Sequence, residues 1–186
     1  MKKTEYERKR MLSREDYDAL CGLLGQLPAS DVTQINHYYD TPDGRMRAEN
    51  TTVRIRDING RLRGTVKRHG KDGCSTEEPF RTDRLPEWLE LDGEMLERRG
   101  SLTTRRKSYR MPDGLLLMLD ENLYLGKSDY ELEIEHPVDK TGQAEGVLLC
   151  LQVLTGHPFP KSETKSERFF RRLEVLNTDP FCIECK

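Results

Sequence analysis

Several short segments of this chain alternate strictly between charged and apolar residues. In Glu131–Glu135 (ELEIE) three glutamates alternate with two aliphatic residues, and in Val53–Arg56 (VRIR) two arginines do the same. Successive side chains of a β-strand point to opposite faces, so each segment predicts a strand with one purely charged and one purely apolar face. This pattern constrains the fold more than any other feature of the sequence, because both faces must be accommodated.

A third segment of this kind lies near the N-terminus. In Glu5–Lys9 (EYERK), a strand would place Glu5, Glu7 and Lys9 on one face. Taken alone, such a row fits the common sheet that has one face in solvent. The complementary charges on the other segments favour a second interpretation, in which these rows face one another and form a site.

Composition shows that the charges are numerous and balanced. Charged residues make up 34% of the 186 residues, with 31 Lys and Arg against 33 Asp and Glu. The charged fraction exceeds the roughly 25% of an average globular protein. The net charge of -2 gives no overall attraction to nucleic acid or to a membrane surface. A charged ligand would have to be held by local clusters, and we expect no nucleic-acid or membrane partner.

Hydrophobic runs and cysteines indicate a cytoplasmic protein. No apolar run approaches the length of a membrane helix, and the charged N-terminus leads into no apolar signal region. The five cysteines are scattered, as in a reducing compartment. Cys182 and Cys185 form a lone CxxC without a second ligand pair, which is a weak indication of a zinc or redox site.

Patterns of alternation, helical periodicity and turn residues predict the remaining elements. Asn59-Gly60 is a strong hairpin signal, and Ser13 with Asp16 resembles a helix cap. Residues 86–99 combine apolar residues with helix formers and predict short helical turns outside the sheet. Strands are predicted at 5–9, 32–40, 52–56, 62–68, 74–81, 102–111, 115–125 and 129–136, and helices at 14–27, 143–154 and 166–176.

These elements predict an α+β fold, mainly β, in one domain over residues 1–186, with a C-terminal helix and tail at 166–186. If about eight antiparallel strands close into a barrel whose aliphatic faces are covered by helices, the charged rows point inward. The predicted architecture is therefore a closed eight-stranded antiparallel β-barrel that forms a charged tunnel, with helices on its outside.

The charged rows indicate the chemistry of such a tunnel. Neighbouring carboxylates repel one another, so a cation must lie among them, and hard oxygen ligands suit Mg²⁺ or Mn²⁺. Arginine and lysine side chains bind phosphate oxygens. Arg106 is preferred to its neighbours because it shares strand parity with Thr104 and Ser108. The carboxylates, called the acidic set below, are Glu5, Glu7, Asp120, Glu131, Glu133 and Glu135.

Taken in order, these motifs resemble the CYTH superfamily, the triphosphate tunnel metalloenzymes. Glu5–Lys9 matches the ExExK signature of that superfamily. A lone ExExK would be weak, but matching segments cover most of residues 4–170 in the expected order. They are Tyr38–Pro42, Val53–Arg56, Thr65–Lys67, Glu77-Glu78, Arg106, Leu119-Asp120, Glu131–Glu135 and Lys165–Phe169.

The resemblance implies a tunnel that binds a triphosphate and cleaves it with a divalent metal. It adds Lys165, which alone would be an ordinary exposed lysine, to the phosphate-binding residues. These residues, the basic set below, are Lys9, Arg54, Arg56, Lys67, Arg106 and Lys165. Within the acidic set, the implied catalytic residues are Glu5, Glu7, Asp120 and Glu133. Glu77 is a secondary candidate, as is Arg63, and the four histidines lie outside the matched motifs.

Three functions fit this reading. The first is metal-dependent hydrolysis of inorganic tripolyphosphate or a small organic triphosphate such as thiamine triphosphate, by attack of activated water on a terminal phosphorus. The second is a class IV adenylyl cyclase that makes cyclic AMP and pyrophosphate from ATP. The third is a non-catalytic module that binds polyphosphate or a nucleotide. The intact acidic rows favour the enzymes, while the physiological triphosphate, the metal and the choice between monomer and homodimer stay open.

Overall fold

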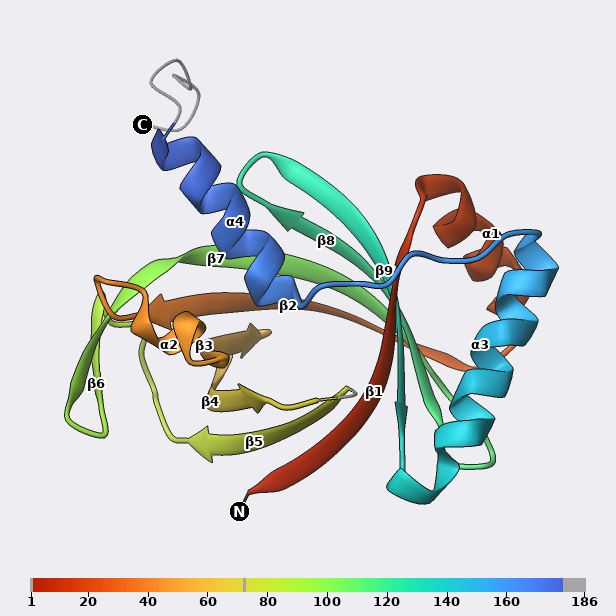
Figure 1. The fold of residues 1–186 in the computed structure, drawn as a ribbon, viewed down its shortest axis with the longest axis horizontal. Coiled ribbons are helices and arrows are strands. Elements are labelled where there is room, and N and C mark those ends of the chain that lie inside the picture. The colour runs from red at the N-terminus through yellow and green to blue at the C-terminus, as the bar shows by residue number, and fades with distance from the viewer. Residues whose placement is uncertain (1, 72, 179–186) are drawn as a thin grey trace.

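A computed structural model describes residues 2–71 and 73–178 (Figure 1). All strand pairings in this part of the chain are antiparallel. The strands are β1 (Lys3–Leu12), β2 (Ala29–Asp40), β3 (Thr51–Ile58), β4 (Arg61–His69), β5 (Cys74–Phe80), β6 (Trp88–Leu91), β7 (Glu94–Arg110), β8 (Leu116–Tyr124) and β9 (Lys127–His136). The helices are α1 (Arg14–Leu24), α2 (Arg45–Ala48), α3 (Thr141–Thr155) and α4 (Lys165–Thr178), with a 3₁₀ turn at Val138–Lys140.

The sheet closes into a barrel through the pairing of β2 with β7. The strand order is β2-β3-β4-β5-β1-β9-β8-β7-β6, and the additional β2–β7 ladder joins the ring. Eight strands therefore form the closed barrel, and β6 lies outside the ring as a hairpin partner of β7. The predicted closed eight-stranded antiparallel barrel is confirmed.

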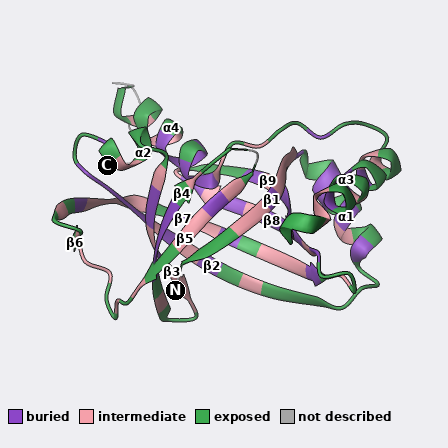
Figure 2. Ribbon diagram, turned by 60° about the horizontal axis from the view of Figure 1, so that its bottom comes forward, coloured by how far each residue is buried: buried purple, intermediate pink, exposed green. Residues whose placement is uncertain are grey.

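Helices cover the outer, apolar face of one side of the barrel. Leu132 and Ile134 of β9 lie in a buried cluster with Leu20 of α1 and with Leu148 and Leu151 of α3. In Figure 1, α1 and α3 lie together on one side of the barrel. Figure 2 shows buried residues along the strands and on parts of these helices. The aliphatic rows are thus removed from water on the outside, which leaves the charged rows to the interior.

Helix α4 packs at one end of the barrel. Its Phe169 and Phe170 share a buried cluster with Tyr38 of β2, Leu102 of β7 and Tyr124 of β8. These three strand residues have the same parity as inward-facing polar residues of their strands, so the aromatic cluster fills the barrel interior at this end. α4 therefore acts as an apolar plug beside the polar tunnel.

The prediction of helical turns at 86–99 was wrong. This segment forms the β6–β7 hairpin, and β7 extends from Glu94, well before the predicted start at 102. Asp92 and Gly93 have φ values of 52° and 81°, as the turn of a two-residue hairpin requires. Leu89 and Leu96 pack on the outer cluster of β3 and β4, and this contact stabilises the hairpin.

Local signals elsewhere were read correctly. The Asn59-Gly60 hairpin joins β3 to β4, with φ values of 53° and 78°, and Ser13 and Asp16 form a capping box on α1. The helix predicted over 14–27 ends at Leu24, and the short α2 was not predicted. None of the described helices is long and apolar enough to span a membrane. Cys182 and Cys185 lie outside the described residues.

The β4–β5 hairpin contacts β1 at the position of Glu7, and we expect this contact to be sensitive to volume. The Glu7 N–H donates to the Gly73 carbonyl at 3.1 Å, and a Cβ on Gly73 would lie 2.2 Å from the Glu7 carbonyl oxygen. We predict that Gly73→Ala lowers the free energy of unfolding by about 1–3 kcal/mol more than Gly60→Ala. Gly60 has a similar φ of 78° and no neighbour within 4 Å, so the difference between the two variants measures the cost of the steric clash at Gly73. Equal urea midpoints for the two variants would contradict the contact.

Candidate functional site

The inward faces of the barrel strands line a narrow polar cavity of about 80 Å³, called the tunnel below. All six members of the basic set line it. Of the acidic set, Glu5, Glu7, Glu133 and Glu135 line it, and the secondary candidate Glu77 does too. Strand parity therefore placed most of the predicted side chains on one common surface, although their roles stay predictions.

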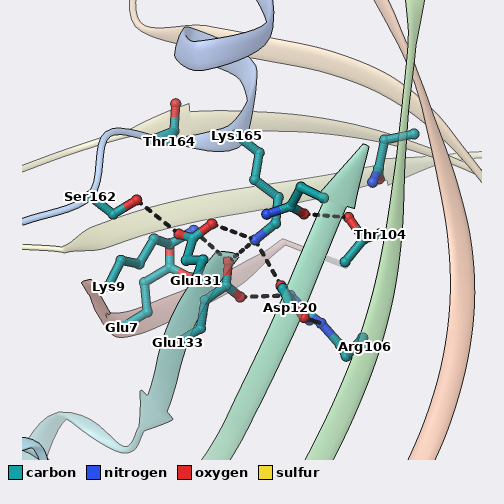
Figure 3. A network of polar contacts seen from close by, with 12 residues as sticks. Glu7, Lys9, Thr104, Arg106, Asp120, Glu131, Glu133, Ser162, Thr164 and Lys165 are labelled. Carbon is teal, nitrogen blue, oxygen red and sulfur yellow. Dashed lines mark hydrogen bonds and ion pairs between the residues drawn. The ribbon is translucent and has the colours of Figure 1, made fainter. Parts of the chain in front are cut away.

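Lys165, at the start of α4, lies among three carboxylates (Figure 3). Its Nζ is 2.8 Å from Asp120 Oδ2 and 2.9 Å from Glu131 Oε2, and it also contacts Glu133 Oε1. Arg106 reaches the same cluster from β7. Its Nε and Nη2 donate to the two oxygens of Asp120 at 2.8 and 2.6 Å, and Nη2 donates to Glu133 at 2.7 Å.

The pKa values of these groups reflect mutual neutralisation. Burial opposes the charge of Lys165, but Asp120, Glu131 and Glu133 outweigh it and raise the pKa of Lys165 to about 12. Burial likewise disfavours the charged form of Glu133, yet Lys165, Lys9 and Arg106 hold its pKa well below the usual range. The cluster is a buried set of ions that stay charged because they are packed against one another.

A second ionic cluster joins β1, β4 and β5. Lys67 Nζ lies 3.3 Å from Glu5, 3.3 Å from Glu7 and 3.5 Å from Glu77. Lys9 connects the two clusters, because its Nζ lies 3.3 Å from Glu7 and 3.2 Å from Glu133. Two lysines thus occupy positions among carboxylates that a metal ion could also occupy.

Glu135 is the carboxylate of the tunnel without a cationic partner among the described residues. It lies directly opposite Glu7 in the β1–β9 ladder. Burial and the nearby carboxylates of Glu5 and Glu133 raise its pKa. The tunnel wall around Glu135, Glu5 and Glu7 is therefore a place where added positive charge would be stabilised.

The opposite imbalance occurs at Arg56 on β3, whereas its neighbour Arg54 donates from Nη2 to Glu77 at 3.0 Å. Arg54, burial and Arg106 together lower the pKa of Arg56 to about 9, and no carboxylate of the described residues pairs with it. Its Nε donates to Asn36 Oδ1 at 3.0 Å. Arg54 Nε and Asn36 Nδ2 are buried without a hydrogen-bond acceptor in the described part of the chain. Buried donors that lack acceptors are costly, so this wall is suited to bind an anion.

Three predicted residues do not reach the tunnel surface. Asp120 and Glu131 are 0% exposed and do not line the tunnel. Glu131 accepts from Ser162 at 3.1 Å and from Arg168 at 2.8 Å, in addition to its contact with Lys165. Arg63 is exposed and lines a separate surface hollow with Phe80.

Sequence reasoning missed Arg168, which is 5% exposed and anchors α4 to the barrel. Its Nε donates to Asp129 at 3.0 Å, its Nη2 to Glu131 at 2.8 Å and its Nη1 to Ser162 at 2.7 Å. The spacing of three residues from Lys165 was an available signal, because side chains at i and i+3 share one face of a helix. Arg168 holds the carboxylate that in turn contacts Lys165.

The missed tunnel residues are polar and uncharged or are histidine. His69 and Thr52 line the tunnel, joined by a 2.9 Å hydrogen bond, as do Gln34 and Asn36. His69 is not among the predicted site residues because it lies outside the matched motifs. Its strand parity with Lys67 was the signal that could have placed it inside.

The donor set suits a hard divalent cation, although a complete metal site is not preformed. No group of three His, Cys, Asp or Glu side chains within residues 2–71 and 73–178 is already arranged to hold a metal ion. The reason is that Lys67 and Lys9 hold the carboxylates of Glu5 and Glu7. The unpaired Glu135 beside them supplies the observation that favours a cation, because an oxygen-ligand group here lacks its counter-charge.

Comparison with known proteins places the chain among relatives of the same size. A family profile described as the CYTH domain matches residues 3–156. The Bacillus subtilis (strain 168) protein YjbK, whose name provisionally assigns it as a triphosphatase, is 30% identical over 185 residues, which cover 89% of this chain and 94% of YjbK.

Two solved structures share the fold. A Bacillus halodurans protein provisionally described as an adenylate cyclase has a TM-score of 0.74 at 24% identity and covers 91% of this chain and 98% of its own. The Hippeastrum protein HpAC1, provisionally an adenylyl cyclase and described as having a dominant triphosphatase activity, has a TM-score of 0.69 at 22% identity. The match covers 92% of this chain and 95% of HpAC1.

We predict that Arg168→Gln lowers the free energy of unfolding by about 3–5 kcal/mol, because it leaves Asp129 buried without its cation and removes one of the two cations that contact Glu131 among the described residues. Arg171→Gln is the matched control on the same helix. Arg171 pairs with Glu163 at the surface, where such pairs contribute about 0–1 kcal/mol. Chemical denaturation of both variants at neutral pH measures the difference. If the free energy of unfolding fell no more in Arg168→Gln than in Arg171→Gln, Arg168 would not be the residue that anchors α4.

His69 should make folding stability depend on pH below neutrality. Burial, with the charges of Lys67 and Lys9, lowers the pKa of His69 from 6.5 to about 4. The folded state therefore resists protonation, so the contribution of His69 is complete above pH 6.5 and is lost as the pH falls from 6.5 towards 4. We predict that His69→Gln loses less stability than the wild type across that window. Urea midpoints measured through the window test this, with His157→Gln, at an exposed histidine, as control.

Proposed function

The chain belongs to the CYTH domain family, and from that premise we propose that it hydrolyses a small triphosphate with the help of a divalent cation, Mg²⁺ or Mn²⁺. The observation that carries this proposal is the segregation of unneutralised charge in one tunnel. Glu135 lacks a cation on one wall, and on another Arg56 lacks an anion while Arg54 Nε, the donor of an arginine otherwise paired with Glu77, lacks an acceptor among the described residues. A triphosphate bound with a divalent cation supplies both missing partners.

The basic set would bind the phosphate oxygens. Arg54 and Arg56 on β3 can offer their guanidinium donors side by side, with Asn36 Nδ2 as a neutral donor between the strands. Arg106 on β7 and Lys165 on α4 line the same tunnel, so the chain of phosphates would be held from several elements of the fold. Contacts from several walls fix the phosphorus atoms in position, which is the main way proteins accelerate phosphoryl transfer.

Glu5, Glu7 and Glu135, with Glu133 beside them, are the residues we propose for the cation. A divalent cation held there would neutralise charge on the phosphate oxygens and lower the pKa of a bound water. The same carboxylates can accept hydrogen bonds from that water and so orient it toward the terminal phosphorus. Asp120 and Glu131, which are fully buried, are better placed to hold Arg106 and Lys165 than to contact a cation directly.

Binding would exchange partners within the tunnel. Lys9 and Lys67 donate hydrogen bonds to carboxylates of the tunnel. When triphosphate and cation enter together, each ammonium can turn to phosphate while the carboxylates turn to the cation. Every buried charge then keeps a partner, which avoids the desolvation penalty of an isolated ion. We therefore expect each ligand to increase the affinity for the other.

The discriminating experiment compares substrates and products. The protein is incubated with tripolyphosphate, thiamine triphosphate and ATP, each with Mg²⁺ or Mn²⁺, and orthophosphate, pyrophosphate and cyclic AMP are assayed. Orthophosphate release supports the hydrolase. Pyrophosphate with cyclic AMP would identify a class IV adenylyl cyclase instead. Binding without any product would leave the polyphosphate- or nucleotide-binding module and contradict both enzyme functions.

Glu7→Gln should separate turnover from folding. The substitution is nearly isosteric but removes the negative charge, so we predict a loss of turnover on the order of 10²-fold or more under saturating metal. The matched control is Glu78→Gln, because Glu78 is adjacent to tunnel residue Glu77 but is 58% exposed and pairs with Arg68 outside the tunnel. Initial rates and thermal melts of both variants provide the readout. Wild-type rates in folded Glu7→Gln would exclude Glu7 from the site.

A further inference from the structure

A second cavity of about 860 Å³ adjoins the tunnel beside the first turn of α4. We call it the side opening. It forms where β5 has stopped pairing with β1 at Tyr6, so that the second half of β1 is flanked by the β4–β5 hairpin and by the segment before α4. Glu7, Lys9, His69 and Thr164 line both cavities. The two spaces therefore meet at these four side chains.

The cations of the side opening include three without a carboxylate partner among the described residues. Arg10 donates from Nη1 to the Lys9 carbonyl at 2.8 Å, and neither Lys71 nor Lys161 forms an ion pair in this part of the chain. Both lysines are exposed and come from different segments of the lining: Lys71 lies between β4 and β5, and Lys161 precedes α4.

The carboxylates that line the side opening are already engaged. Glu145 pairs with Arg8, Glu167 accepts from the backbone N–H of Thr164 at 2.7 Å, and Glu7 lies between Lys9 and Lys67. Among the described residues that line the opening, three cations without a carboxylate partner therefore outnumber the one carboxylate without a cation, Glu167, so their uncompensated charge is positive. A positive opening attracts anions and disfavours a cationic group such as a thiazolium ring.

The described lining also has no aromatic side chain of Phe, Tyr or Trp on which a nucleobase could stack. The ring nitrogen Nε2 of His69 is held by Thr52. Recognition of a base usually combines stacking on an aromatic ring with hydrogen bonds. The chemistry of the side opening is instead that of a basic, solvated groove that follows a polyanion.

We propose that the side opening binds the phosphate units beyond the third of a linear inorganic polyphosphate whose terminal three units occupy the tunnel. This inference rests on the proposed function, because it extends the same substrate out of the same tunnel. Hydrolysis would join the oxygen of water to the terminal phosphorus and break the bridging P–O bond. The products are orthophosphate, a chain shortened by one unit and a proton released to solvent.

The test uses charge reversal at the two exposed lysines. Lys71→Glu/Lys161→Glu is compared with Lys127→Glu, a change at an exposed lysine of β9 that lines neither cavity. Binding of tripolyphosphate and of long-chain polyphosphate is measured by calorimetry in EDTA at low and high salt, and kcat/KM for both is measured with Mg²⁺. Because binding is measured without turnover, the side opening is tested even if no substrate is hydrolysed.

We expect the wild type to bind the long chain more tightly than tripolyphosphate, with a steeper loss of affinity as salt increases. The double variant should lose about tenfold in affinity for the long chain and much less for tripolyphosphate, while Lys127→Glu changes neither. Equal affinities of the wild type for both chains, or equal losses for both chains in the double variant, would overturn the inference. Failure to hydrolyse tripolyphosphate would instead contradict the proposed function.

Discussion

The structure depends on the mutual neutralisation of charges inside the barrel. An isolated carboxylate or ammonium in such an interior costs several kcal/mol, and a pair regains this only with good geometry. Lys165 has three carboxylates around it and Lys67 has three others. Each ammonium therefore forms ion pairs with side chains from strands that are distant in sequence. The ion pairs connect β1, β4, β5, β8 and β9 to one another and to α4. The barrel can turn its aliphatic faces outward because its inward charges satisfy one another.

Neutralisation is incomplete at two places, as would not be expected of a salt-bridge network that serves stability alone. Strands packed only for stability would give Glu135 a cation and Arg56 an anion. Instead, burial and the carboxylates of Glu5 and Glu133 raise the pKa of Glu135, and Arg54, burial and Arg106 lower the pKa of Arg56. Perturbed groups that face one cavity are typical of functional sites. The residual charges have opposite signs on different walls, so the tunnel is complementary to a ligand that carries both signs, such as a metal-bound phosphate chain.

Strand parity explains how much of this could be predicted from the sequence. A period of two assigns Glu133 or Arg106 to a face without any knowledge of packing, and the closed barrel followed from where those faces must go. Parity does not show which carboxylates are already paired with cations and hydrogen-bond donors. Glu131 and Glu135 belong to one row, yet the first is enclosed by Ser162, Arg168 and Lys165 and the second has no cation. That difference depends on where α4 docks. The β6–β7 hairpin was missed because the helix-forming residues of this segment were given more weight than the Asp92-Gly93 turn signal. In the structure, the packing of Leu89 and Leu96 on the outer cluster favours the hairpin.

The docking of α4 also links the end of the chain to the site. The family profile ends at residue 156, whereas Lys165 and Arg168 come from the helix that follows. Phe169 on the same helix fills the end of the barrel, so the apolar contacts that seat α4 also deliver an ammonium to the tunnel. Because Arg168 and Lys165 share Glu131, a displacement of the helix would leave buried carboxylates without their cations and would remove the Lys165 ammonium from the tunnel. The electrostatic cost of breaking these ion pairs therefore stabilises the docked position of α4. The same helix position sets both which charges line the tunnel and how the end of the barrel is filled.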